Sequence, residues 1–548
     1  MNAQAPVVTT DSGAVRGAWH EHTSADGRTS RHAVFRGIPF AAAPVGQLRF
    51  AAPQPPVAWD GVRDATQFGP TPQRISPYNP PRVPEPSIPG EETLNVSVTT
   101  PDPSASAGLP VLVYIHGGGF IGGSPASPWY VGEAFARDGV VTAVLSYRLG
   151  FEGFAWLADA GRDGVVNNRG VLDWLFGLEW VQRNIAAFGG DPSRVTIAGQ
   201  SAGGAAVMRL LTMPSAQHLF QGVLALSPAD ASSPVEATAE ATRRVAQASG
   251  CEPTAESASR VHEDVFFAHR EAVDPPRDPS QPRIIFKDAP LALAPCVDGE
   301  VCEQTVSDAL AAGVGADKRL FIGSTAHEFT MMLSPSRQQL AGLDPVPLLV
   351  EAGASEELAR DVVEDARERG ELERGTAWVL GQAISDVIFR SCVAHWAQTR
   401  KGGPAPPGRT TSGGSRARPT SRARRTASTS PSAWTCCPRR GSRRRSDRSR
   451  RRRSPTSCTP TGWASSATAR WTPPSTATAG RPSSTDRMPV IGAWSRHTGC
   501  RSASGTRSTP RPPPHPDERP APSGLTLIFA SAHPELHPSH RVKRRSGA

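Results

Sequence analysis

The first 400 residues alternate short apolar runs with segments whose apolar residues recur every three or four positions. Runs of four to eight apolar residues are typical of buried strands, and the longer spacing is typical of helices that bury one face. The expected strands are 111–115, 140–147, 195–198, 223–227 and 319–324, and the expected helices are 169–188, 202–211, 356–371 and 376–399. Alternating strands and helices indicate a mostly parallel sheet covered on both faces, so the predicted fold class is α/β.

The pattern stops near residue 400, and the composition changes at the same point. Residues 401–548 hold 29 Lys and Arg against 5 Asp and Glu, whereas residues 1–400 hold 31 against 45. The later segment is rich in Arg, Pro, Ser and Thr and cannot bury enough apolar surface to offset the entropy of ordering it. We predict a globular domain over 1–400 and a disordered or frame-shifted basic segment over 401–548, which is not part of the fold.

The spacing of the cysteines and the amino-terminal sequence indicate the cellular compartment in which the protein works. The eight cysteines show no C-x-x-C spacing, and no early segment joins a basic start to a long apolar run. We therefore expect neither a signal peptide nor a membrane span, and we expect the protein to work in the reducing cytoplasm.

The most specific local pattern is the G-x-S-x-G run from Gly199 to Gly203, between an expected strand and an expected helix. Such a run forms a sharp strand-to-helix turn that presents a nucleophilic serine, and small neighbours permit the tight backbone. An ordinary serine in a glycine-rich turn is the alternative, but the flanking strand and helix favour a nucleophile. Ser201 is the predicted nucleophile, and the amide of Ala202 is a predicted donor to a developing oxyanion.

A second glycine run, His116-Gly117-Gly118-Gly119-Phe120, follows the expected strand 111–115. Acyl transfer places negative charge on the carbonyl oxygen, and consecutive glycines let backbone amides approach it. We predict that the amides of Gly118 and Gly119 complete an oxyanion hole. A flexible glycine loop is the alternative.

Glu328 is the predicted acid of the site, because it follows the expected strand 319–324. Catalytic groups of open α/β sheets gather at the carboxyl ends of the strands. A surface glutamate is the alternative interpretation of this residue. Asp298 is the second candidate acid, although its neighbours favour a turn-capping role.

Together these groups resemble the type-B carboxylesterase/lipase family, which includes the cholinesterases. The likeness covers nearly all of residues 5–400. It extends over the segments 35–41, 44–46, 49–50, 59–62, 146–150, 168–173, 180–185 and 188–192. The resemblance implies an α/β-hydrolase fold that needs no metal or cofactor. It also implies a small-molecule ester substrate, Ser201 as the acyl-enzyme nucleophile and Glu328 as the triad acid.

The chain departs from the family where the triad histidine is expected. Family members carry a Gly-Ala-x-His segment roughly a hundred residues after the acid, and the likeness ends at Gln398. His395 lies too early, and the later histidines stand in Pro/Ser/Arg-rich sequence: His497, His515, His533, His537 and His540. The catalytic histidine is therefore unassigned, and the domain is predicted to be incomplete.

A shifted reading frame explains the departure. When the codons of residues 419–437 are regrouped by one base, the junction of Arg425 and Thr426 permits a histidine within a Gly-Ala-x-His-like context. Out-of-frame GC-rich coding sequence also yields the observed Arg, Pro, Ser and Ala. We hypothesise that the frame shifts between about 401 and 419.

The predicted function is hydrolysis of carboxylic esters by a serine nucleophile. Removal of a triad base can cost ~10⁶ in kcat, so the chain as written is expected to be impaired. A non-catalytic binding protein on the same fold is the alternative. Nucleic-acid binding through the arginine runs is less favoured, because no aromatic residues or folded reader accompany them. We make no prediction of oligomeric state.

Overall fold

The computed structural model describes residues 4–23, 27–72, 83–273, 291–331, 333–400 and 434–436. The chain divides into two compact units, and one of them holds every described residue. The other, Gly441–Ser523, lies outside the described residues, and so does the rest of the predicted basic segment 401–548 except 434–436.

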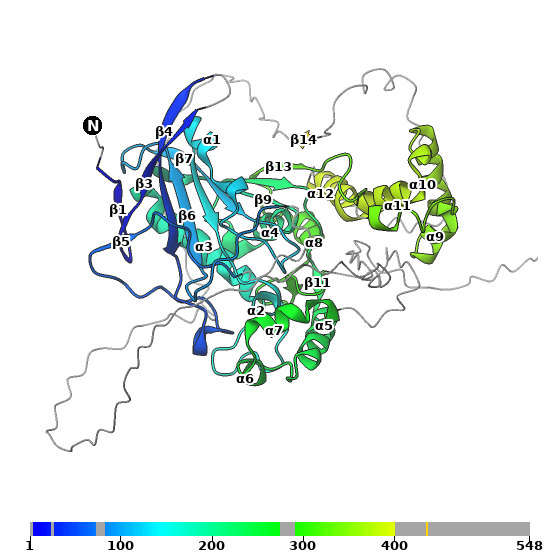
Figure 1. Cartoon of the computed structure of the whole chain (residues 1–548), viewed down its shortest axis with the longest axis horizontal. Helices are drawn as coiled ribbons and strands as arrows, with labels where there is room; N and C mark the ends of the chain where they lie inside the picture. Colours follow the sequence, from blue (N-terminus) through cyan, green and yellow to red (C-terminus); the bar gives the residue numbers. More distant parts are fainter. Residues whose placement is uncertain are drawn as a thin grey trace, which may run out of the picture. The chain divides into compact units, whose positions relative to one another are not determined.

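Within the described residues, the main sheet has nine strands in the order β14-β13-β10-β9-β7-β8-β6-β4-β3 (Figure 1). The strands are β3 Ala18–Thr23, β4 Thr29–Pro39, β6 Asn95–Thr100, β7 Leu109–Ile115, β8 Val141–Leu145, β9 Gly190–Gln200, β10 Gly222–Leu226, β13 Arg319–Gly323 and β14 Trp434–Cys436. The five strands from β8 to β13 in this order run parallel, and the flanking strands pair antiparallel. The predicted α/β class, with a mostly parallel central sheet, is confirmed.

Two small sheets accompany the main one. The first contains β1 Val7–Thr10, β2 Gly13–Arg16 and β5 Val62–Asp64. The second contains β11 Ser233–Pro234 and β12 Cys296–Val297. The α-helices are α1 Glu133–Arg137, α2 Gly150–Phe154, α3 Arg169–Asn184, α4 Ala202–Leu211, α5 Val235–Ala248, α6 Ala255–Ala258, α7 Glu263–Ala268, α8 Val306–Ala311, α9 Pro345–Glu351, α10 Glu356–Glu368, α11 Thr376–Ser385 and α12 Ser391–Arg400. Helices therefore surround a sheet whose central strands are buried, as β8 shows by being buried at every position.

Several element ends differ from the sequence prediction. The nucleophile strand β9 starts at Gly190, five residues before the predicted start. Helix α3 ends at Asn184 and continues as a 3₁₀ turn, Ile185–Phe188, which Gly189 ends with a φ of 83°. A left-handed residue of this kind closes a helix at little cost only when it is glycine. These differences leave the order of the elements unchanged.

A second hydrophobic cluster lies apart from the core of the sheet. It joins the three helices α9, α10 and α11 through buried residues such as Leu349, Val363 and Leu380. Ser355 caps the amino-terminal end of α10, because its hydroxyl accepts a hydrogen bond from the Leu358 amide. Its first turn carries acidic residues and its last turn carries Arg367, which matches the helix dipole. Figure 1 shows this group at one end of the sheet, after β13.

The helix predicted over 376–399 is interrupted within the observed helical stretch Thr376–Arg400. A π-helical segment, Asp386–Arg390, separates α11 from α12. The whole stretch is long and apolar enough to cross a membrane, but 67% of its most apolar window is buried inside the protein. That burial is what a core helix of this composition shows.

Strand β14 is an exception to the predicted end of the fold at residue 400. Its residues Trp434, Thr435 and Cys436 pair antiparallel with Gly323, Ile322 and Phe321 of β13. An edge strand with unpaired backbone groups attracts another strand, and this three-residue segment covers part of β13. The rest of the segment after residue 400 lies outside the described residues.

Candidate active site

Ser201 occupies a strained turn between β9 and α4. Its φ of 58° and ψ of −121° lie in a region that side-chain-bearing residues rarely adopt. The Ser201 amide donates to the Leu226 carbonyl at 2.9 Å, and the Ser201 carbonyl accepts from Ala205 at 2.8 Å. The backbone is thus fixed on both sides of the serine, as the G-x-S-x-G pattern predicts.

Close backbone contacts bring this turn against the glycine run after β7. A Cβ added to Gly203 would collide with the Ile115 carbonyl, so only glycine lets α4 start here. A Cβ on Gly117 would lie 2.6 Å from the Gln200 carbonyl and 3.3 Å from the Ser201 Cβ. The predicted nucleophile and the predicted oxyanion loop therefore meet at the carboxyl ends of β7 and β9.

The predicted oxyanion loop, His116–Phe120, has an unusual backbone that hydrogen bonds hold in place. Gly118, Gly119 and Phe120 all have positive φ angles, of 118°, 64° and 63°. The Gly118 carbonyl accepts from the amides of Ile121 and Gly122 at 3.2 and 3.0 Å. The Phe120 carbonyl accepts from Gly150 at 2.7 Å. Such preorganised amides suit stabilisation of a developing negative charge.

Glu328 lies just after β13, where the sequence placed it, and one of its oxygens is held twice. The Ser227 hydroxyl donates to Glu328 Oε1 at 2.6 Å, and the Thr325 amide donates to the same oxygen at 2.7 Å. A carboxylate held by two donors keeps a fixed orientation. No described residue bonds the second oxygen, Oε2, so the role of Glu328 as the acid of a triad stays a prediction.

Ser227 is the residue of this site that sequence reasoning missed. It directly follows β10. The carbonyl of the preceding residue, Leu226, accepts the hydrogen bond from the Ser201 amide. Its positive φ of 46° resembles the strain at Ser201. The sequence signal is its position at the carboxyl end of the expected strand 223–227, since Glu328 was selected by its place beyond the end of another strand.

A buried ion pair supports the segment behind the oxyanion loop. Arg148 contacts Asp173 through Nη2 at 2.7 Å and Nε at 2.9 Å, and its amide donates to the same carboxylate at 2.9 Å. The two side chains are 3% and 0% exposed. Arg148 stands two residues before Gly150, which donates to the oxyanion loop, so this pair positions the loop's anchor.

The histidines of the described residues do not supply a base bonded to Glu328. His116 is fully buried beside the oxyanion loop, and burial lowers its pKa to about 4. His327 is exposed, and its Nδ1 is bonded to Gln382. His395 is exposed on α12. The remaining candidates all lie outside the described residues: His497, His515, His533, His537 and His540.

Asp298 caps a turn, as its neighbours predicted. Its Oδ1 accepts from the amides of Glu300 and Cys302, and its Oδ2 accepts from Asn168 Nδ2 at 2.7 Å. These bonds use both carboxylate oxygens, which explains why Asp298 serves the turn rather than the candidate site. Among the described residues, no group of three His, Cys, Asp or Glu side chains is arranged to hold a metal ion.

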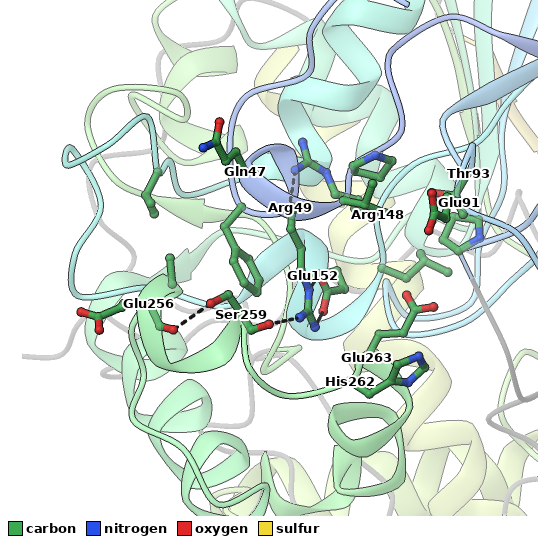
Figure 2. A pocket seen from close by; sticks show the side chains of 18 of the residues that line it. Gln47, Arg49, Glu91, Thr93, Arg148, Glu152, Glu256, Ser259, His262 and Glu263 are labelled. Carbon is green, nitrogen blue, oxygen red and sulfur yellow. Dashed lines mark hydrogen bonds and ion pairs between the residues drawn. The ribbon is translucent and has the colours of Figure 1, made fainter. Parts of the chain in front are cut away.

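A cavity among the described residues is lined by residues other than the predicted nucleophile, acid and oxyanion donors. It has a volume of about 1490 Å³ and lies between the segment around Arg49 and helices α2, α6 and α7 (Figure 2). Arg49 binds Glu152 with two hydrogen bonds at 2.7 and 3.1 Å and reaches the Val261 carbonyl at 2.7 Å. Of the described residues that line the cavity, none belongs to the predicted nucleophile, acid or oxyanion donors.

Comparison with known proteins agrees with this geometry. The para-nitrobenzyl esterase of Bacillus subtilis is 36% identical over 344 residues, which are 60% of this chain and 64% of the relative. The fumonisin B1 esterase of Sphingopyxis macrogoltabida is 36% identical over 300 residues, 54% of this chain and 53% of the relative. The chain thus spans between about half and two thirds of the length of these curated relatives.

Solved structures show the same fold. A carboxylesterase of Geobacillus stearothermophilus matches with a TM-score of 0.58 and 31% identity, over 72% of this chain and 76% of that one. A PNB esterase matches with a TM-score of 0.55 and 29% identity, over 72% and 78%. The central sheet with its serine elbow is therefore that of an α/β hydrolase. Residues 4–400 also match the model of the carboxylesterase family, and the chain belongs to that family.

Proposed function

We propose that the protein is a serine hydrolase that cleaves small carboxylic esters. The observation that carries this proposal is the contact between the strained Ser201 turn and the oxyanion loop at Gly117. The Ser201 hydroxyl oxygen attacks the ester carbonyl carbon, and its proton passes to a base. The carbonyl oxygen becomes an oxyanion that accepts from the amides of Gly118, Gly119 and Ala202.

Collapse of this intermediate completes the first half of the reaction. The carbonyl reforms, the bond to the alcohol oxygen breaks, and the alcohol takes the proton from the base. Water then attacks the acyl-enzyme by the same route and releases the acid. Glu328 orients the base in this scheme, because Ser227 and Thr325 hold its carboxylate at the end of β13.

We further propose that the base is encoded in a shifted frame after residue 400. The support is the reversal of charge at that point and the end of the family match at residue 400. The segment in question lies outside the described residues. Resequencing of the gene tests this part directly, and a gene with the frame restored should yield a protein whose kcat is higher by up to ~10⁶.

A fluorophosphonate probe tests the proposed chemistry in the full chain. We expect a covalent adduct on the peptide that contains Ser201, and Ser201→Ala should abolish it. Ser193→Ala is a matched control, because Ser193 lies at the exposed start of the same strand β9, where its amide and hydroxyl donate to the Asp191 carboxylate. Absence of the adduct and of p-nitrophenyl ester turnover, in both the natural and the frame-restored protein, would refute the proposal.

We propose a reducing, cytoplasmic compartment as well. Four cysteines of the described residues carry free thiols: Cys251, Cys296, Cys302 and Cys392. Free buried thiols are common where the environment keeps cysteine reduced. Cell fractionation with an antibody to the protein tests this, and recovery in a secreted fraction would contradict it.

A further inference from the structure

The fully buried His116 has no part in the mechanism above, yet it contacts the oxyanion loop directly. Its ring nitrogen Nδ1 lies 2.9 Å from the Gly117 carbonyl oxygen. Gly123 packs over the same edge of the ring, since a Cβ added there would collide with Nδ1 and with the Gly117 oxygen. The contact is therefore enclosed by protein atoms.

The geometry of a peptide group turns this contact into control over an oxyanion donor. The carbonyl of Gly117 and the amide of Gly118 belong to one planar trans peptide, so they point in opposite directions. A bond that holds the Gly117 oxygen toward the ring directs the Gly118 N–H away from it. Gly117, which supplies the carbonyl of this peptide, lies against the serine turn, since a Cβ added to it would be 3.3 Å from the Ser201 Cβ.

Within the part of the chain that the structure describes, the peptides of the other two donors are fixed by backbone hydrogen bonds. The Gly118 carbonyl, which fixes the Gly119 amide, accepts from the amides of Ile121 and Gly122. The Ser201 carbonyl, which fixes the Ala202 amide, accepts from Ala205. Among the three predicted donors, the Gly118 amide is the one whose peptide is held by a side chain.

The ring of His116 is itself held in place. Tyr147 stacks on it, with ring centroids 4.6 Å apart and planes 27° apart. The Tyr147 hydroxyl also donates to the His116 carbonyl at 2.9 Å. Rotation of the ring would break its stacking on Tyr147, and the bond from the Tyr147 hydroxyl to the His116 carbonyl keeps that tyrosine beside it.

The protonation state of the ring follows from its partners. Because a carbonyl only accepts, Nδ1 must carry the proton, and the neutral ring then has an unprotonated Nε2. That Nε2 is buried and has no hydrogen-bond partner in the described structure. A neutral imidazole leaves one ring nitrogen without a proton, so the unpaired Nε2 fits this tautomer.

We propose that His116, as the neutral Nδ1–H tautomer, is a positioning residue that aims the Gly118 amide at the oxyanion, an inference that rests on the proposed function. His116 touches neither substrate nor the reacting atoms. Its effect passes through one peptide group. Loss of a whole oxyanion donor typically costs about 10²–10³ in kcat, which sets the upper limit for misorienting one.

Three variants of the full chain test the proposal. Asn carries its amide nitrogen at nearly the position of Nδ1, so His116→Asn keeps the donor, whereas His116→Phe keeps the ring and removes it. His32→Phe is the matched control, because His32 is also buried with an unpartnered nitrogen but lies on β4. We expect His116→Phe to lower kcat on p-nitrophenyl butyrate about tenfold to hundredfold with little change in KM. His116→Asn should retain most of the wild-type kcat.

Two measurements remain decisive whether or not esters are turned over. Nitrogen-15 NMR of ring-labelled histidine should show the Nδ1–H tautomer for the resonance that disappears in His116→Asn. Hydrogen exchange of the 117–119 amides should accelerate in His116→Phe and stay near wild type in His116→Asn and His32→Phe. An Nε2–H tautomer, or equal exchange in His116→Phe and His32→Phe, would overturn the positioning role. A wild-type chain with neither turnover nor fluorophosphonate adduct would overturn the proposed function instead.

Discussion

Replacing Asp173 by Ala should destabilise the protein more than almost any other single change in the described residues. The substitution removes a carboxylate that binds the Arg148 side chain twice and its amide once. Arg148 would keep only the Arg49 and Ala51 carbonyls, at 3.1 and 2.8 Å. Its charge would then be buried, at 3% exposure, without a counterion.

The expected cost follows from that burial. Breaking a buried ion pair by removing one partner costs about 3–5 kcal/mol, because the remaining charge is uncompensated. A domain has a total stability of about 5–15 kcal/mol, so this loss is a large fraction of it. Asp173→Leu combined with Arg148→Met should recover most of the loss, since apolar residues of similar volume replace such pairs at little cost.

Urea unfolding followed by tryptophan fluorescence measures both changes. The control is Glu356→Ala on α10, which breaks an exposed pair with Arg360 and should cost less than about 1 kcal/mol. The reasoning fails if Asp173→Ala costs no more than Glu356→Ala. It also fails if the double variant is less stable than Asp173→Ala alone, because packing rather than charge would then dominate.

Three further outcomes follow from the site. Ser227→Ala should lower kcat/KM about tenfold or more, because Glu328 loses a charge-assisted hydrogen bond; an unchanged value would exclude an orienting role for the hydroxyl. Gly203→Ala should prevent the elbow from forming, since its Cβ collides with the Ile115 carbonyl; a soluble variant labelled by fluorophosphonate at the wild-type rate would contradict this. Burial holds the pKa of His116 at about 4, below its ordinary 6.5, so the unfolded chain binds more protons between these values. Stability should be complete above pH 6.5 and fall by about 3 kcal/mol toward pH 4, and His116→Asn should flatten this part of the stability profile.

The sequence predicted the elements that carry the site, because the signals are local. Ser201 stands out through the glycines around it, and Glu328 and the Gly117–Gly119 run stand out because each follows a strand. The positive φ of Ser201 also follows from the pattern, since the turn requires it.

What the sequence did not reveal depends on contacts between distant segments. Ser227 is an ordinary serine until β10 and β13 place it against Glu328, 101 residues later in the chain. The π-helical break at Asp386–Arg390 has no Pro or Gly to mark it, so periodicity alone predicted one helix. The pairing of β14 with β13 lies within sequence that shows no strand pattern at all.

At Ser201, the backbone conformation that the proposed activity requires also lowers the stability of the fold. A serine at φ 58° and ψ −121° stores strain of about 1–3 kcal/mol that glycine would release. Random drift or a screen for heat resistance would therefore gain by exchanging this serine, and would lose the nucleophile in doing so. Under the proposed function, a lineage that no longer cleaved esters would have no reason to keep this strained serine.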